Sequence, residues 1–168
     1  MNVISDFLLI ATTIVAFLIA PNAGANEPET TDQLQPLASW TITAAEAKRR
    51  NVPIVILFEQ RNCGFCQRLK KELFRPTANN PEYSRRAIFV SVLTDYDADL
   101  LEHGNTQISG FEFAEQFKAL TTPTVLFIDS TGKTVEKRIV GYVSGDQYNQ
   151  SFKRKLEASI AAVSTVGV

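Results

Sequence analysis

Residues 53–73 read PIVILFEQRNCGFCQRLKKEL, and the rest of the chain can be interpreted from the local fold of this stretch. The unbroken apolar run at 55–58 is typical of a buried strand. Phe65, Leu69 and Leu73 recur at every fourth position, which gives the following segment a helical apolar face. We therefore expect a buried strand that turns directly into a helix.

Cys63 and Cys66 are the only cysteines of the chain, and they fall at this turn. The start of a helix offers unpaired backbone N–H groups and the positive end of the helix dipole, which favour a thiolate at Cys63. A thiolate attacks disulfides, and a second thiol close by can resolve the mixed disulfide that forms. The pair therefore predicts a redox site in which Cys63 attacks and Cys66 resolves.

The residues around the pair are basic, which should favour the thiolate, although helix surfaces are often basic for solubility alone. They are Arg61, Arg68, Lys70, Lys71 and Arg75. Arg61 is the candidate for a direct effect on Cys63.

Other uses of two cysteines can be weighed against redox chemistry. A structural zinc site usually needs four ligands, whereas the chain has two cysteines and one histidine, so we expect no metal site. Covalent haem attachment needs a histidine directly after the second cysteine, and Gln67 stands there. A structural disulfide is the remaining alternative, but so small a loop restrains the unfolded chain little.

Residues 1–25 have the form of a signal peptide, with an apolar run at 7–20 and small residues at 23–25. The leader has no lysine or arginine, so an uncleaved N-terminal anchor is the alternative. The apolar run is shorter than the ~20 residues that span a bilayer, and Pro21 ends it. Either form predicts that the remaining chain is exported, to the periplasm of a bacterium.

The remaining chain has the size and charge of one ordinary exported domain. Subtracting a 25-residue leader from 168 leaves about 143 residues, enough for a single core. The full chain has 17 basic and 18 acidic residues, and the leader contains only Asp6, so 17 of each remain and no nucleic acid or anionic membrane is expected as a partner. Residues 26–38 are polar and broken by prolines, which predicts a flexible tether before a domain at 39–168.

The alternation of helical and strand patterns predicts an α/β fold, with a central mixed sheet flanked by helices on both faces. Residues 94–110 are expected to be a solvated loop; a calcium site is disfavoured because Leu100 and Leu101 interrupt the acidic residues. The expected elements, in chain order, are a helix from a capping box at 43–46 to before Pro53, a strand at 53–59, a helix at 64–75 stopped by Pro76, a strand at 87–93, a helix at 111–120, an antiparallel pair at 124–129 and 134–140, and a terminal helix after Ser144.

Two motifs together resemble the thioredoxin superfamily over about residues 40–162. They are the cysteine pair after a strand and the tripeptide Thr-Pro-Thr at 122–124 before a later strand. The resemblance implies that Pro123 is cis and faces the cysteines, where it binds the substrate backbone with Thr122 beside it. It also places the spacer residues Gly64 and Phe65 at the substrate. From the residues alone, a trans proline that opens a strand is the alternative.

Within the superfamily, the chain looks most similar to exported thioredoxins such as those of bacterial sulfur-oxidation systems. It departs from ordinary thioredoxins at Leu57, where many place a buried aspartate that accepts the proton of the resolving cysteine. Strand alternation puts Leu57 and Glu59 on one face, so Glu59 is the candidate general base for Cys66. An exposed glutamate paired with a nearby basic residue is the alternative.

These observations predict a periplasmic thiol–disulfide oxidoreductase, a monomer without cofactor or metal, that mainly reduces disulfides of exported proteins. Its electrons would come from a membrane thiol donor. A dithiol oxidase or isomerase is the alternative within the class, although the 37 residues between Ala25 and Cys63 leave no room for the dimerisation domain of bacterial isomerases. A binding module or copper carrier on the same scaffold is the alternative outside it.

Overall fold

The computed structural model describes residues 32–166 and contains a five-stranded mixed sheet. The strand order is β1-β3-β2-β6-β7. β1 and β3 run parallel to β2, whereas β6 is antiparallel to β2 and β7 is antiparallel to β6. The strands are β1 (Gln35–Pro36), β2 (Ile54–Glu59), β3 (Ile88–Leu93), β6 (Thr124–Ile128) and β7 (Thr134–Val140). The predicted mixed sheet and the antiparallel β6–β7 pair are confirmed.

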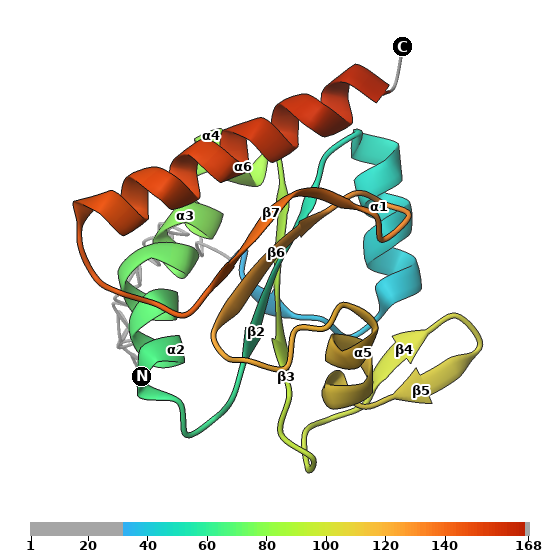
Figure 1. The fold of residues 1–168 in the computed structure, drawn as a ribbon. Helices are drawn as coiled ribbons and strands as arrows, with labels where there is room; N and C mark the ends of the chain where they lie inside the picture. The colour runs from blue at the N-terminus through green and yellow to red at the C-terminus, as the bar shows by residue number, and fades with distance from the viewer. Residues whose placement is uncertain (1–31, 167–168) are drawn as a thin grey trace, which may run out of the picture. The chain divides into compact units, whose positions relative to one another are not determined.

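Helices cover both faces of the sheet (Figure 1). α1 (Trp40–Arg50) and α5 (Gly110–Gln116) cover one face. The opposite face carries α6 (Asp146–Val166) and the segment that follows the cysteines. That segment comprises α2 (Gly64–Leu69), the π-helix η1 (Lys70–Phe74), α3 (Arg75–Asn79) and α4 (Pro81–Ser84). The predicted α/β fold with helices on both faces is therefore confirmed.

The central strand β2 is buried on both faces, which explains its unbroken apolar run. Val55 and Leu57 lie in the core beneath α2 and α6, and Ile56 and Phe58 lie in the core beneath α1 and α5. Burial of each such side chain stabilises the fold by about 1.5–3 kcal/mol. The same alternation directs Glu59, at the end of the strand, toward the α2 face.

The helix after the cysteines does not end at Pro76, and this prediction is wrong. The backbone N–H of Arg75 donates to the carbonyl of Lys70, five residues back, so the helix widens into a π-turn before the proline. Pro76 follows directly after this π-turn, and the helix continues through it to Asn79. Leu69 and Leu73 are buried as predicted, but Phe65 is 61% exposed and leaves the predicted apolar face.

α1 begins three residues before the capping box that the sequence indicates. Ser39 is its N-cap and accepts a hydrogen bond from the backbone N–H of Ile42 at 3.1 Å. The carboxylate of Glu102 accepts hydrogen bonds from the hydroxyls of Ser39 and Thr41, close to the positive end of the helix. The N-cap at Ser39 therefore depends on Glu102, 63 positions away, and no local sequence pattern indicates this contact.

The polar segment before α1 is part of the fold where the structure describes it. β1 pairs with β3, and the side chains of Leu34 and Leu37 are buried. The expected flexible tether is therefore wrong for residues 32–38. Residues 26–31 and the expected signal peptide at 1–25 lie outside the described residues.

The segment at 94–110 contains a hairpin of β4 (Leu101–His103) and β5 (Thr106–Ile108). Gly104 turns it with a φ of 68°, a left-handed conformation that glycine adopts without strain. Leu101 is buried in the core with α1, so the expected solvated loop is wrong for this part. Within residues 32–166, no helix is long and apolar enough to cross a membrane.

Candidate active site

Cys63 and Cys66 form a disulfide at the first turn of α2, with their Cα atoms 5.2 Å apart. Cys63 is the N-cap residue, and its Sγ accepts a hydrogen bond from the backbone N–H of Cys66 at 3.1 Å. Cys63 is half-buried, whereas Cys66 is fully buried. The predicted place of the pair at a strand-to-helix turn is confirmed, and the two sulfurs differ in access to solvent.

The turn between β2 and α2 is held by the loop that follows β3. The backbone N–H of Arg61 donates to Asp95 Oδ2 at 3.1 Å, and its guanidinium donates to Asp97 Oδ1 at 2.6 Å. The carbonyl of Arg61 accepts from Gln67 Nε2 at 2.9 Å. Arg61 therefore fixes the turn, and its pairing with Asp97 weakens any direct effect of its charge on Cys63.

The Thr122–Pro123 peptide bond is cis. Thr124 opens β6 directly opposite Phe58 of β2, so Pro123 comes before β6 where Glu59 ends β2. The hydroxyl of Thr122 donates to Gln60 Oε1 at 3.0 Å. The carbonyl of Pro123 accepts from the backbone N–H of Gly141 at 2.8 Å, which leaves Thr122 to offer backbone groups at this edge.

Glu59 is 3% exposed and forms an ion pair with Lys70 beneath the helix. A buried carboxylate is costly unless it has a charged or hydrogen-bonding partner, and Lys70 supplies one. Lys70 lies four residues after Cys66, one turn further along the helix. Both residues line a cavity of about 260 Å³. The predicted face of Glu59 is confirmed, and the carboxylate is buried as well as paired.

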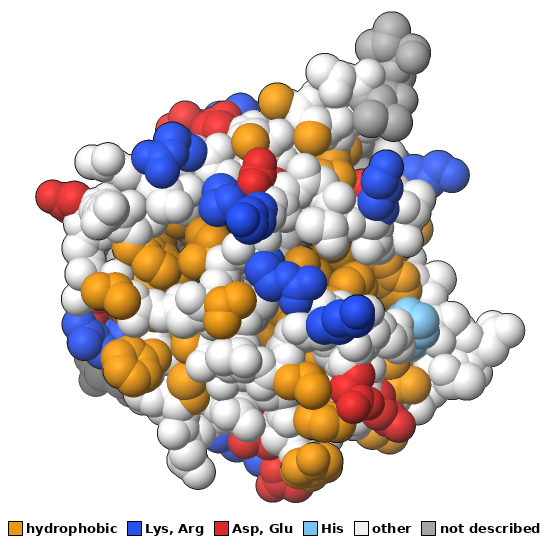
Figure 2. All heavy atoms as spheres, in the orientation of Figure 1, with side chains coloured by type: hydrophobic (Ala, Val, Ile, Leu, Met, Phe, Trp, Pro, Cys, Tyr) orange, Lys and Arg blue, Asp and Glu red, His pale blue; other side chains and the backbone are white. Residues whose placement is uncertain are grey.

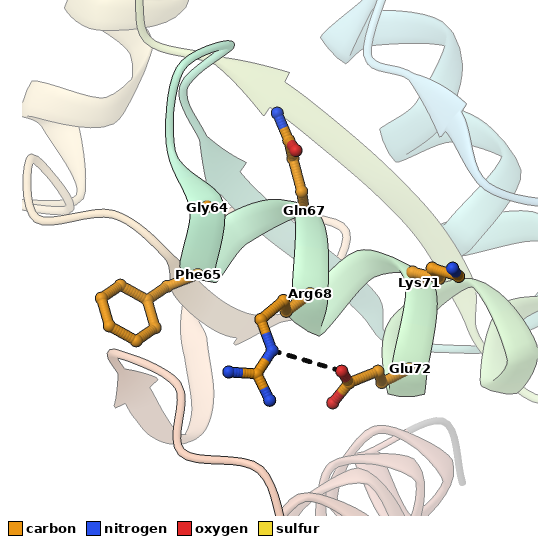
Figure 3. A pocket seen from close by; sticks show the side chains of 6 residues that line it. All are labelled: Gly64, Phe65, Gln67, Arg68, Lys71 and Glu72. Atoms are coloured by element: carbon orange, nitrogen blue, oxygen red, sulfur yellow. Dashed lines mark hydrogen bonds and ion pairs between the residues drawn. The ribbon is translucent and has the colours of Figure 1, made fainter.

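Beside the disulfide, a surface groove of about 640 Å³ follows the exposed side of the helix. Figure 3 shows the side chains that line it: Gly64, Phe65, Gln67, Arg68, Lys71 and Glu72. The predicted substrate residues Gly64 and Phe65 thus lie together at the end of the groove beside Cys63. Thr122 and Pro123 do not line it.

A hydrogen-bond network joins this helix to the loop that follows β7. Tyr142 donates its hydroxyl to Glu72 Oε2 at 2.6 Å, and Arg68 contacts Glu72 Oε1 at 3.3 Å and Ser144 Oγ at 3.0 Å. Burial, together with the hydrogen bond to Glu72, raises the pKa of Tyr142 to about 12. The same hydrogen bond lowers the pKa of Glu72. The partners Tyr142 and Glu72 are 70 residues apart, so no local sequence pattern indicates this network.

Within the described part of the chain, no group of three or more His, Cys, Asp or Glu side chains could hold a metal ion.

A disulfide at the first turn of a helix, directly after the central strand of a mixed sheet, defines an α/β protein built around a dithiol–disulfide couple. Residues 41–155 match the model of the thioredoxin-like domain, and the chain belongs to that family. The recognised superfamily is confirmed. No match was found among curated proteins.

Solved structures show the same fold at low sequence identity. A DsbH oxidoreductase is 20% identical with a TM-score of 0.55, over 82% of this chain and 94% of that one. A poplar thioredoxin h is 19% identical with a TM-score of 0.51, over 68% and 86% of the two chains. A thioredoxin of Malassezia sympodialis is 16% identical with a TM-score of 0.51, over 76% and 90%.

Proposed function

We propose that the protein is a thiol–disulfide oxidoreductase that mainly reduces disulfides of exported proteins. One observation carries the proposal: a half-buried Cys63 caps a helix directly above a fully buried Cys66, and the two form a disulfide. One sulfur can meet a large substrate while the other is protected. This is the arrangement that a two-step exchange requires.

The exchange begins with the reduced pair. The Cys63 thiolate attacks one sulfur of the substrate disulfide, forms a mixed disulfide and releases the other substrate sulfur as a thiolate. Cys66 loses its proton and attacks Cys63 Sγ, which releases the second substrate thiolate and forms the Cys63–Cys66 disulfide. Two electrons pass from the pair to the substrate, and the protein is left oxidised.

Helix geometry supports Cys63 as the attacking sulfur. The backbone N–H of Cys66 points at Cys63 Sγ, and the helix dipole adds positive potential at the same atom. Both favour the thiolate without any neighbouring cation. Arg61 is therefore not required for activation.

Glu59 is the proposed base for the proton of Cys66. It lies on the α2 face of the sheet beneath the helix, and its partner Lys70 is one turn from Cys66. A carboxylate that is shielded from bulk water and held in one place is suited to accept a proton from a buried thiol. The adjoining cavity of about 260 Å³ offers room for water that could pass the proton onward.

Pro123 and Thr122 are proposed to hold the substrate backbone, and Gly64 and Phe65 to contact its side chains. The Thr122–Gln60 hydrogen bond supports this, because Gln60 also accepts a hydrogen bond from the backbone N–H of Cys63 at 3.3 Å and so links Thr122 to the turn that carries the cysteines. The carbonyl of Pro123 is already bonded to Gly141, so Thr122 is the residue proposed to pair with the substrate.

Export to the periplasm is proposed from the leader. The apolar run at 7–20 and the small residues at 23–25 have the form that a signal peptidase cleaves. A reductant in that oxidising compartment needs a steady supply of electrons, and a membrane thiol donor is the proposed source. The protein is proposed to act as a monomer.

The order of attack can be tested by replacing each cysteine. Cys66→Ser should accumulate a stable mixed disulfide with substrate proteins, because the resolving thiol is gone. Cys63→Ser should accumulate none, because Cys66 is buried. Non-reducing electrophoresis followed by mass spectrometry measures the adducts. Faster alkylation of Cys66 than of Cys63 in the reduced protein would reverse the assignment.

The role of Glu59 predicts a defect in the second step alone. Glu59→Gln should slow resolution of the mixed disulfide at least about tenfold, the lower range for loss of a general base, and leave the first attack unchanged. Rapid-mixing kinetics over about pH 6 to 9 separate the two steps. Glu115→Gln, an exposed change on α5, is the control. An unchanged resolution rate would make water the proton acceptor.

The direction of electron flow predicts the reduction potential of the pair. Equilibration with glutathione should give a value below about −250 mV, in the range of reducing thioredoxins. A value near −120 to −180 mV, about that of known oxidases and isomerases, would reverse the proposed direction. A pair that stays masked by copper until a chelator is added would instead favour a carrier.

Export predicts the N-terminus of the mature protein. The chain recovered from the periplasm of an expressing bacterium should begin near Asn26, as N-terminal sequencing would show. Recovery in the membrane fraction with Met1 in place would show an anchor instead. Recovery of the full-length chain in the cytoplasm would contradict export.

A further inference from the structure

The groove beside the disulfide has the apolar side chain of Phe65 at one end and cations along its length. Phe65 is 61% exposed, and Val143 of the loop after β7 is 75% exposed. Arg68 donates to Ser144, the neighbour of Val143, and follows Phe65 by one helical turn. Figure 3 shows Phe65 and Arg68 projecting from the same side of the helix, toward that loop. One exposed apolar residue thus comes one turn before Arg68 on the helix, and another comes next to its hydrogen-bond partner Ser144 on the loop.

The surface around this point is also apolar. Figure 2 shows hydrophobic side chains exposed where α2 and the loop after β7 lie, on the face that Figure 1 presents. Exposed apolar side chains that gather beside a reactive group mark a contact surface more often than isolated ones do. A binding partner would cover Phe65 and Val143 together.

The charges of the groove do not cancel. Arg68 and Lys71 are cations, and Glu72 is the one anion among the lining residues. Both oxygens of Glu72 are engaged, one by Tyr142 and one by Arg68. Lys71 is exposed and forms no ion pair with any residue in 32–166. A ligand in the groove therefore meets an uncompensated positive potential beside an apolar contact.

We propose that this groove selects disulfide-bonded protein segments in which an apolar residue and an acidic residue flank the reacting cysteine. The apolar side chain lies between Phe65 and Val143, and the carboxylate pairs with Arg68 or Lys71. Tyr142 and Glu72 hold Arg68 in place, so they act as positioning residues. The inference rests on the proposed function, since it names the class of substrate that the cysteine pair reduces.

The test uses the reduced full-length protein and disulfide-linked dimers of short peptides. Each peptide has one cysteine flanked by leucine, and the next position on both sides is aspartate, asparagine or lysine. The second-order rate of reduction should be about five- to tenfold higher for aspartate than for lysine, with asparagine between. The preference should fade as ionic strength rises from about 0.01 M to about 1 M.

Variants assign the preference to this groove. Arg68→Gln with Lys71→Gln should bring the three peptide rates to within about twofold of one another. Arg154→Gln, an exposed charge change on α6, is the matched control and should keep the full preference. Phe65→Ser should keep the charge preference but reduce the rate advantage of these peptides over a second set in which serine replaces each leucine.

Each outcome separates this inference from the function on which it rests. Reduction of the neutral hydroxyethyl disulfide with equal rates for all peptides would overturn the inference and leave the oxidoreductase intact. A preference for lysine, or one that survives the double variant, would also overturn it. Failure to reduce any disulfide would overturn both proposals.

Discussion

The pairing of β2 with two strands at once is the constraint on which the site depends. Its residues from Ile54 to Glu59 are in register with β3, and all but the last also pair with β6. The strand is buried on both faces, so a shift of its register by one residue would turn each of its side chains from one core to the other. Because the cysteines begin four residues beyond its end, this register fixes where the first turn of α2 lies relative to Pro123.

Glu59 departs from the apolar composition of β2. Every other residue of β2 is apolar, and each is buried. A carboxylate at the last position needs a cation, and the helix above supplies Lys70. Replacing a buried ion pair with apolar side chains often leaves stability unchanged or improves it, so stability alone does not explain why this pair is present. Departures from local consistency of this kind tend to occur at functional sites.

The sequence predicted those parts of the structure that short-range patterns determine. β2, β3 and β6 are apolar runs because both of their faces are covered. The position of the cysteine pair between a strand pattern and a helix pattern indicates the turn on which it lies. β1 was missed because it has two exposed residues, one of them a proline, and it exists only through its pairing with β3. The partners Glu59–Lys70, Tyr142–Glu72 and Arg61–Asp97 were missed because folding, and not chain order, brings them together.

The π-turn sets the rotational phase of the helix that carries Cys66. Six positions along this helix are buried: Cys66, Leu69, Leu73, Phe74, Thr77 and Ala78. The first and the last are twelve residues apart, whereas three turns of an α-helix take about 11 residues. Over three turns this spacing runs about one residue ahead of an ideal helix, and one wide turn absorbs that residue. A regular helix of the same sequence would turn Ala78 roughly 120° away from the sheet whenever Cys66 faced it. The extra residue thus lets one continuous helix be docked at both ends.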